Sequence, residues 1–175
     1  FHASYIADMT LFVKKYREFD VVPKAVLSYC GGYQDPMFAV NLGKDANVFA
    51  GPNAIAASLF PKIKVAGQIN ALYRPKAGVD IDGPTIEDFS SAMVIADAIN
   101  RAGSTDPAKV LQVLTTATFD APYFVSGKVK FNEKGQNAYS ASVMTQVLNG
   151  QYEAVWPVEF KTADAVPAFP AWNKR

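Results

Sequence analysis

The stretch KAVLSYCGGYQDP, residues 24–36, decides the fold that the sequence predicts. It opens with the apolar run Ala25–Leu27, which is too short for a helix and is typical of a buried strand. It then breaks at Gly31–Gly32, where the backbone can approach a ligand closely, and Asp35–Pro36 is a suitable start for a helix. The stretch therefore predicts a strand, a glycine turn and a helix.

Polar and aromatic residues stand at the end of that predicted strand. Open α/β sheets bind ligands in the crevice beyond the carboxyl ends of their strands. Ser28, Tyr29 and Cys30 occupy such an end, and Gly31–Gly32 follow them. These residues are candidate ligand contacts. An ordinary strand-to-helix turn, with glycines that only make it tight, remains the alternative.

Composition excludes several classes of protein. The chain has 175 residues, about one ordinary domain, with half of its residues hydrophobic and a formal net charge of +1. There is no basic block to bind nucleic acid. Cys30 is the only cysteine and His2 the only histidine, so an internal disulfide, a histidine-rich metal site and a histidine triad are all excluded. No apolar run approaches the ~20 residues of a membrane span.

Hydrophobic periodicity predicts an α/β fold with a parallel sheet, because helices and strands alternate along the first half of the chain. The NG dipeptide at Asn149–Gly150 predicts a C-terminal β-hairpin. The tail from Ala163 to Arg175 is expected to be irregular and to lie on the surface. In chain order we expect helices at about 4–19, 36–42, 61–74 (ended by Pro75), 85–102 and from 107, and strands at 25–29, 48–50, from 127, 143–148 and 152–156.

No motif indicates catalysis, a metal or a cofactor. Asp80, Asp82, Glu87 and Asp88 match no calcium loop, and a solvated linker with a helix start explains them. Ser90–Ser91 lack a histidine base and an SxxK lysine. We therefore predict no catalytic residue, no metal ligand and no cofactor.

Several segments, in their order along the chain, resemble the C-terminal half of a type I periplasmic solute-binding protein. The resemblance is to the branched-chain amino-acid receptors of ABC importers, and it covers most of the chain. The matching segments are PKAVLSYCGGYQDPMF, LGKDANVFAG, ADAINRAGSTDPAKVLQVL, GKVKFNEKGQN, VMTQVLNGQYEAVWP and PAFPAWNKR.

The resemblance implies an architecture of two α/β lobes with the solute in the cleft between them. Residues 1–83 would then be the later part of the second lobe, 84–140 a return segment of the first lobe, and 141–175 a hairpin back in the second lobe followed by the tail. The missing N-terminal half of the protein would supply most of the first lobe. The N-terminus, Phe1–His2–Ala3, likewise looks like a cut from a longer chain.

The resemblance also implies two ligand contacts. Tyr5 matches an aromatic residue that contacts the solute in the Leu/Ile/Val binders. Cys30 stands where those binders place a glutamate that holds the ligand's ammonium group. Without that carboxylate a charge-assisted bond of about 1.5–3 kcal/mol is lost, so we expect a carboxylate or amide ligand without an α-ammonium.

The function expected from the resemblance is non-catalytic. The protein would be a periplasmic or membrane-tethered receptor, made with a signal peptide, that delivers a small molecule to a membrane permease. Two alternatives are an intracellular ligand-sensing domain of the same fold and an α/β enzyme whose catalytic residues lie outside this sequence. The strand end offers only Ser28, Tyr29 and Cys30 for chemistry, which disfavours the enzyme.

Overall fold

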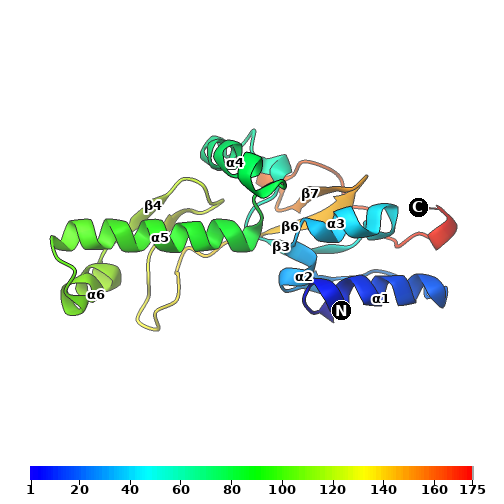
Figure 1. Ribbon diagram of the computed structural model, residues 1–175, viewed down its shortest axis with the longest axis horizontal. Coiled ribbons are helices and arrows are strands. Elements are labelled where there is room, and N and C mark those ends of the chain that lie inside the picture. Colours follow the sequence, from blue (N-terminus) through cyan, green and yellow to red (C-terminus); the bar gives the residue numbers. More distant parts are fainter. Residues whose placement is uncertain (175) are drawn as a thin grey trace.

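The computed structural model describes residues 1–174 and has a mixed α/β architecture (Figure 1). The α-helices are α1 (Ile6–Glu18), α2 (Gly31–Gln34), α3 (Met37–Leu42), α4 (Lys64–Ala77), α5 (Gly83–Ala102) and α6 (Pro107–Thr116). The strands are β1 (His2–Ala3), β2 (Ser28–Tyr29), β3 (Ala50–Asn53), β4 (Phe119–Ala121), β5 (Gly127–Val129), β6 (Val143–Leu148) and β7 (Gln151–Trp156). Four short 3₁₀ turns lie at Gly43–Ala46, Ala57–Leu59, Val158–Phe160 and Trp172–Lys174.

Five of the strands follow one another laterally in the order β1, β2, β3, β6, β7. β1 pairs with β2 in parallel, and an isolated parallel bridge between Leu27 and Ala50 joins β2 to β3. β6 is antiparallel to both β3 and β7. The parallel neighbourhood of the first two predicted strands is thus confirmed, although the regular pairing is shorter than 25–29 and the second strand starts later than Val48.

β3 contains Gly51–Pro52, although the sequence predicts that this strand ends at residue 50. A Cβ on Gly51 would lie 2.3 Å from the Ser28 carbonyl oxygen and 2.7 Å from the Tyr33 ring. Only glycine allows β2 and α2 to approach β3 this closely. The glycine is therefore a packing requirement within the strand, and β3 continues to Asn53.

The C-terminal hairpin is confirmed and lies against β3. β6 and β7 pair with Leu148 opposite Gln151, and the turn residues Asn149 and Gly150 have φ values of 52° and 78°. Positive φ at both turn positions matches the right-handed twist of the strands and explains the NG preference.

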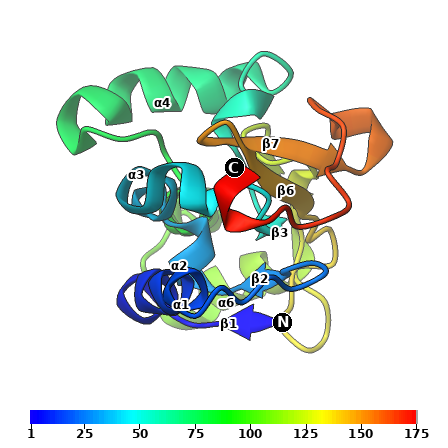
Figure 2. The same ribbon diagram turned by 90° about the vertical axis from the view of Figure 1, so that its right-hand side faces the viewer.

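The molecule has two bodies along its long axis, as Figure 1 shows, and Figure 2 looks along that axis with β3, β6 and β7 toward the viewer's side. One, which we call the strand body, contains β1–β3, β6 and β7 with α1–α3. Its hydrophobic cluster is centred on Met9, Val13, Phe38 and Phe49. The other contains α5, α6, β4 and β5. A second cluster, which includes Leu59, Ile86 and Phe119, joins α4 and the strand body to α5. β4, which pairs antiparallel with β5, was not predicted.

Two predictions about chain segments are wrong. Pro75 does not end α4: the helix continues to Ala77, and Gly78, with φ 78° and its N–H on the Arg74 carbonyl, is the C-terminal cap. The tail is irregular, but it is not confined to the surface. Phe169 is buried against Phe49, Trp172 is buried against Phe169, and the Trp172 Nε1 donates to the Val21 carbonyl at 3.0 Å.

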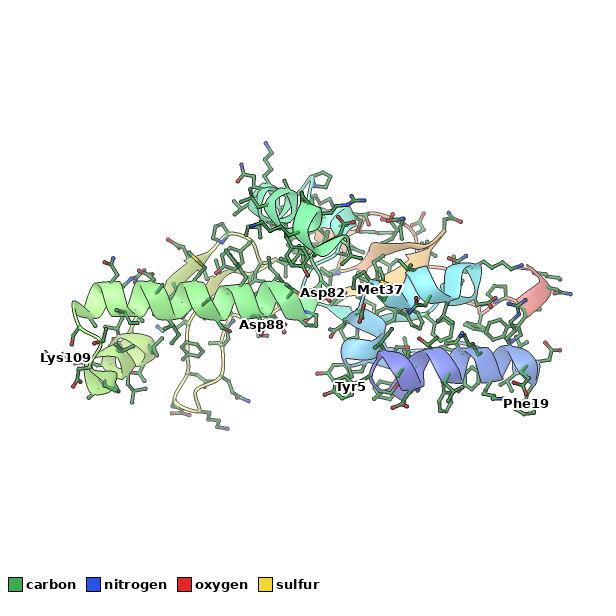
Figure 3. All side chains as sticks on the ribbon, in the orientation of Figure 1. Tyr5, Phe19, Met37, Asp82, Asp88 and Lys109 are labelled. Atoms are coloured by element: carbon green, nitrogen blue, oxygen red, sulfur yellow. The ribbon has the colours of Figure 1, made fainter. Side chains whose placement is uncertain are left out.

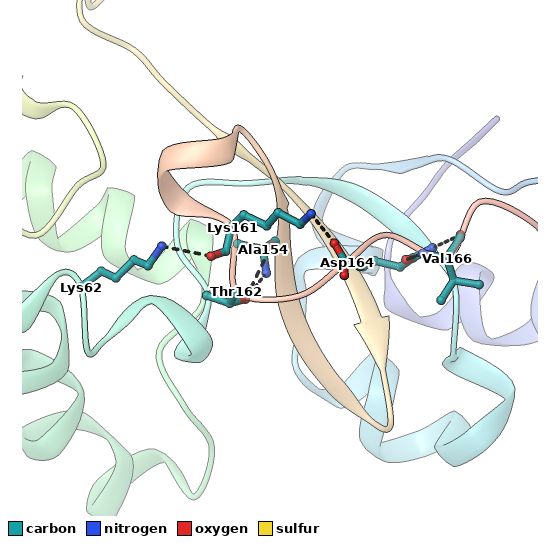
Figure 4. Close-up of polar contacts among 7 residues, drawn as sticks. Lys62, Ala154, Lys161, Thr162, Asp164 and Val166 are labelled. Carbon is teal, nitrogen blue, oxygen red and sulfur yellow. Dashed lines mark hydrogen bonds and ion pairs between the residues drawn. The ribbon is translucent and has the colours of Figure 1, made fainter.

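The segment that joins β7 to the tail is held by hydrogen bonds along the outer edge of the hairpin (Figure 4). The Thr162 N–H donates to the Ala154 carbonyl at 2.7 Å, and its Oγ1 accepts from the Ala154 N–H. Lys62 Nζ donates to the Lys161 carbonyl at 3.0 Å. These bonds cover the free edge of β7, which protects it from pairing with another chain.

Candidate functional site

Tyr5 and the Gly31–Gly32 turn lie side by side at one rim of the strand body. The Gly32 N–H donates to the Ser4 carbonyl at 3.0 Å, and a Cβ on Gly32 would lie 2.4 Å from that oxygen. A Cβ on Gly31 would lie 3.5 Å from the Tyr5 ring. The Tyr5 side chain is 72% exposed and stands at the end of α1 nearer to α5 (Figure 3). The rim therefore presents an aromatic ring beside an exposed stretch of backbone.

The end of β2 supplies the other candidate residues. Ser28 is buried, at 1% exposure, whereas Tyr29 on the opposite face is 57% exposed. Within the described residues the Ser28 Oγ has no hydrogen-bond partner. Cys30 is partly exposed and adopts a φ of 79°, a conformation that non-glycine residues rarely adopt. The structure thus brings Tyr5 and residues 28–32 together at one rim of the strand body.

Asn53 is a residue that the sequence analysis missed. It ends β3 at the same edge of the sheet as Cys30, because β2 and β3 run in parallel. It is 3% exposed, its Oδ1 has no hydrogen-bond partner among residues 1–174, and that oxygen packs against Gly83 at the start of α5. The rule that ligands bind beyond the carboxyl ends of strands points to Asn53 only when β3 is known to continue through Gly51–Pro52 to this residue.

Two tyrosines hold the turn beneath the rim. The buried Tyr33 hydroxyl lies 3.0 Å from the Thr145 carbonyl, and the Tyr152 hydroxyl donates to the Tyr33 carbonyl at 2.6 Å. Burial raises the pKa of both phenols well above the usual value, and for Tyr152 the neighbouring Tyr33 and Asp35 add to the shift. Both hydroxyls therefore remain protonated donors at neutral pH.

The rim has little fixed charge. Residues 28–34 contain no carboxylate, and the Asp35 Oδ1 accepts from the Met37 N–H at 2.8 Å at the start of α3. Burial lowers the pKa of His2, so this imidazole is neutral near pH 7. No cluster of three metal-ligating side chains occurs in residues 1–174. The arrangement suits hydrogen bonding and stacking rather than acid–base chemistry.

The larger hollows lie away from this rim. One of about 420 Å³ lies between α5 and the segment after β5, lined by apolar residues and by Glu87, Ser90 and Ser126. Another of about 600 Å³ lies between α4, α5 and β4. Both border α5, whose Met93 and Ile95 are about half exposed. The rim itself is open surface, as expected for one wall of a site that a second wall completes.

The sequence profile of a family described as periplasmic binding protein matches residues 1–151. A Leu/Ile/Val-binding protein homolog 7 from Brucella suis is 26% identical over 161 residues, which is 88% of this chain and 40% of that protein. The leucine-binding protein LivK from Thermotoga maritima superposes with a TM-score of 0.70 at 22% identity, over 87% of this chain and 42% of LivK. A solute-binding protein from R. palustris, solved with benzoate, has a TM-score of 0.59 at 12% identity, over 92% and 48% of the two chains.

The chain belongs to the periplasmic binding protein family. It has the type I fold of the branched-chain amino-acid receptors, and the family binds and transports solutes rather than transforming them. The chain spans about 40% of the length of the curated relatives it matches. None of the helices in residues 1–174 is both long and apolar enough to span a membrane.

Proposed function

We propose that the protein is the extracytoplasmic solute-binding component of an ABC importer. The ligand would lie in a cleft between two lobes, with Tyr5, residues 28–32 and Asn53 on this chain's wall. Family membership and the alignment of these groups along one edge of the sheet support the proposal. A membrane permease would receive the ligand, and a signal peptide on the precursor would direct export.

The two bodies support a division of the chain between two lobes. Residues 1–83 and 141–175 would belong to the second lobe, since β6 and β7 return to β3. Residues 84–140 would belong to the first lobe, because α5 leads away from the strand body (Figure 1). The N-terminal half of the protein would cover the half-exposed side chains of α5 and fill the hollows beside it.

The ligand would be a small carboxylate or amide without an α-ammonium group. The observation that carries this proposal is the absence of any carboxylate in residues 28–34, with Cys30 at the strand end. A buried ammonium would lack a charge-assisted partner there, a loss of about 1.5–3 kcal/mol. The benzoate bound by the R. palustris protein is a ligand of this kind, whereas the leucine of the LivK name is the alternative.

Calorimetric titration of the full-length, exported protein tests this function. The panel contains benzoate, a short aliphatic amide, L-leucine and L-valine. We expect at least one carboxylate or amide to bind more tightly than either amino acid, by about tenfold or more. Sub-micromolar binding of leucine would contradict the ligand assignment. A precursor without an export signal would favour an intracellular sensor of the same fold.

A further inference from the structure

The helix α2, which lies beneath the rim, is too short to be stable without contacts to other elements. It has four residues and no side-chain cap, and the backbone bonds at its ends are the Asp35 N–H to the Gly31 carbonyl and the Tyr33 N–H to the Cys30 carbonyl. A single turn costs more conformational entropy than its hydrogen bonds return. The position of α2 must therefore come from contacts with other elements.

The hairpin supplies these contacts from more than 100 residues further along the chain. The Tyr152 hydroxyl shares its proton between the carbonyls of Tyr33, at 2.6 Å, and Asp35, at 3.1 Å. These are carbonyls at the C-terminal end of α2, where intrahelical donors are missing. The ring of Tyr152 also packs edge-on against the Tyr33 ring, with centroids 5.4 Å apart.

A second contact fixes α2 from beneath. The Tyr33 hydroxyl lies 3.0 Å from the Thr145 carbonyl oxygen and 3.1 Å from the Thr145 Oγ1. The Thr145 Oγ1 donates in turn to the Gly51 carbonyl at 3.0 Å. β6, β3 and α2 are thus linked through fully buried groups.

The opposite end of α2 is the rim itself. The Gly32 N–H bonds the Ser4 carbonyl, and the space beside it admits no Cβ. Any displacement of α2 therefore shifts Gly31 relative to the Tyr5 ring. We infer that Tyr152 is a positioning residue for solute binding and that Thr145 assists it by holding Tyr33. Tyr152 would set the geometry of the rim without contacting the solute. This inference rests on the proposed function.

The test compares Tyr152→Phe with Tyr139→Phe in the full-length protein. Tyr139 is a half-exposed tyrosine in the segment before β6 and serves as the matched control. Affinity is measured by calorimetry for benzoate and L-leucine. Amide hydrogen exchange is measured at residues 31–35, with α1 as the internal reference.

Tyr152→Phe should weaken binding of whichever probe the parent binds by about three- to tenfold and accelerate exchange at 31–35 by a similar factor, with α1 unchanged. Thr145→Val should act in the same direction. Unchanged affinity and exchange, or acceleration that is equal in α1, would overturn the inference. If the parent binds neither probe, the ligand proposal fails, and the exchange pattern alone decides whether Tyr152 positions the rim.

Discussion

The helices of the two bodies are specified in different ways. α5 and α6 carry their own signals: the Asp82 carboxylate accepts from the Thr85 N–H, the Asp106 carboxylate accepts from the Ala108 N–H, and a proline follows each cap. α1 and α2 have no side-chain cap, and in α3 the Asp35 carboxylate accepts from the Met37 N–H, but α1 and α3 also bury Met9, Val13 and Phe38. α6 has no buried residue among those described. Burial of side chains therefore does most to stabilise the helices of the strand body. The helices of the other body are specified by local signals in the sequence, and their side chains are only partly buried.

The largest expected loss of stability comes from removing a side chain of the tail from the core of the strand body. Phe169→Ala should lower the free energy of unfolding by about 3–4 kcal/mol, because the ring packs against Phe49 and Trp172. Denaturant unfolding measures the change. The control is Phe19→Ala, whose ring is 71% exposed and should cost less than about 1 kcal/mol. Equal, small effects would mean that the tail does not stabilise this core.

A substitution on α5 tests whether other residues of the full-length protein bury the exposed side of this helix. Ile95 is 46% exposed in this chain, so Ile95→Ala should cost less than about 0.5 kcal/mol here. In the proposed full-length protein the same change should cost about 2 kcal/mol or more, because the first lobe would bury the side chain. Unfolding of both proteins by denaturant gives the comparison. The same small cost in each would contradict the proposed lobe division.

Loss of a local signal should have a smaller effect. Asp106→Ala removes an acceptor for the Ala108 and Lys109 N–H groups and should destabilise the chain by about 1 kcal/mol. Asp106→Asn keeps an acceptor and should restore most of the stability. Amide exchange in the first turn of α6 would locate the change. Unaltered exchange there would show that packing, and not the cap, fixes this helix.

The smallest effect concerns pH. Burial, followed by repulsion from Asp88 and Asp82, raises the pKa of Glu87. A raised pKa means that the folded state binds this proton more tightly than the unfolded state, so ionisation of Glu87 at neutral pH opposes folding. Glu87→Gln should therefore stabilise the chain slightly at pH 7, and the gain should vanish as the pH falls below the pKa values of Glu87 in both states. Unfolding midpoints at pH 7 and pH 4 check this sign.

The difference between the two bodies also explains which elements were predicted correctly from the sequence and which were not. Both ends of α5 and the start of α6 were predicted to within about two residues because Gly103 and Asp106–Pro107 act locally, and Asn149–Gly150 specify the hairpin in the same way. The prediction failed where distant contacts decide. Gly51–Pro52 lies inside β3 because Ser28 and Tyr33 pack against it, and Phe169 is buried because of residues more than 100 positions away.

The candidate site shows the same limit. The rule that ligands bind beyond the carboxyl ends of strands was enough to select Ser28, Tyr29 and Cys30 with Gly31–Gly32. It needs only one strand and the turn that follows it. Asn53 depends on where β3 ends, and the support from Tyr152 depends on how the hairpin returns. Neither fact is contained in a local pattern.

Alkylation of Cys30 tests most directly whether the solute binds at this rim. Cys30 is the only cysteine in the 175 residues and is partly exposed, so iodoacetamide labels a single position in this part of the protein. The rate is measured by peptide mass mapping of the full-length protein, with and without a saturating solute from the titration panel. We predict that bound solute slows alkylation of Cys30 by about tenfold or more. An unchanged rate with saturating solute would contradict the placement of the site.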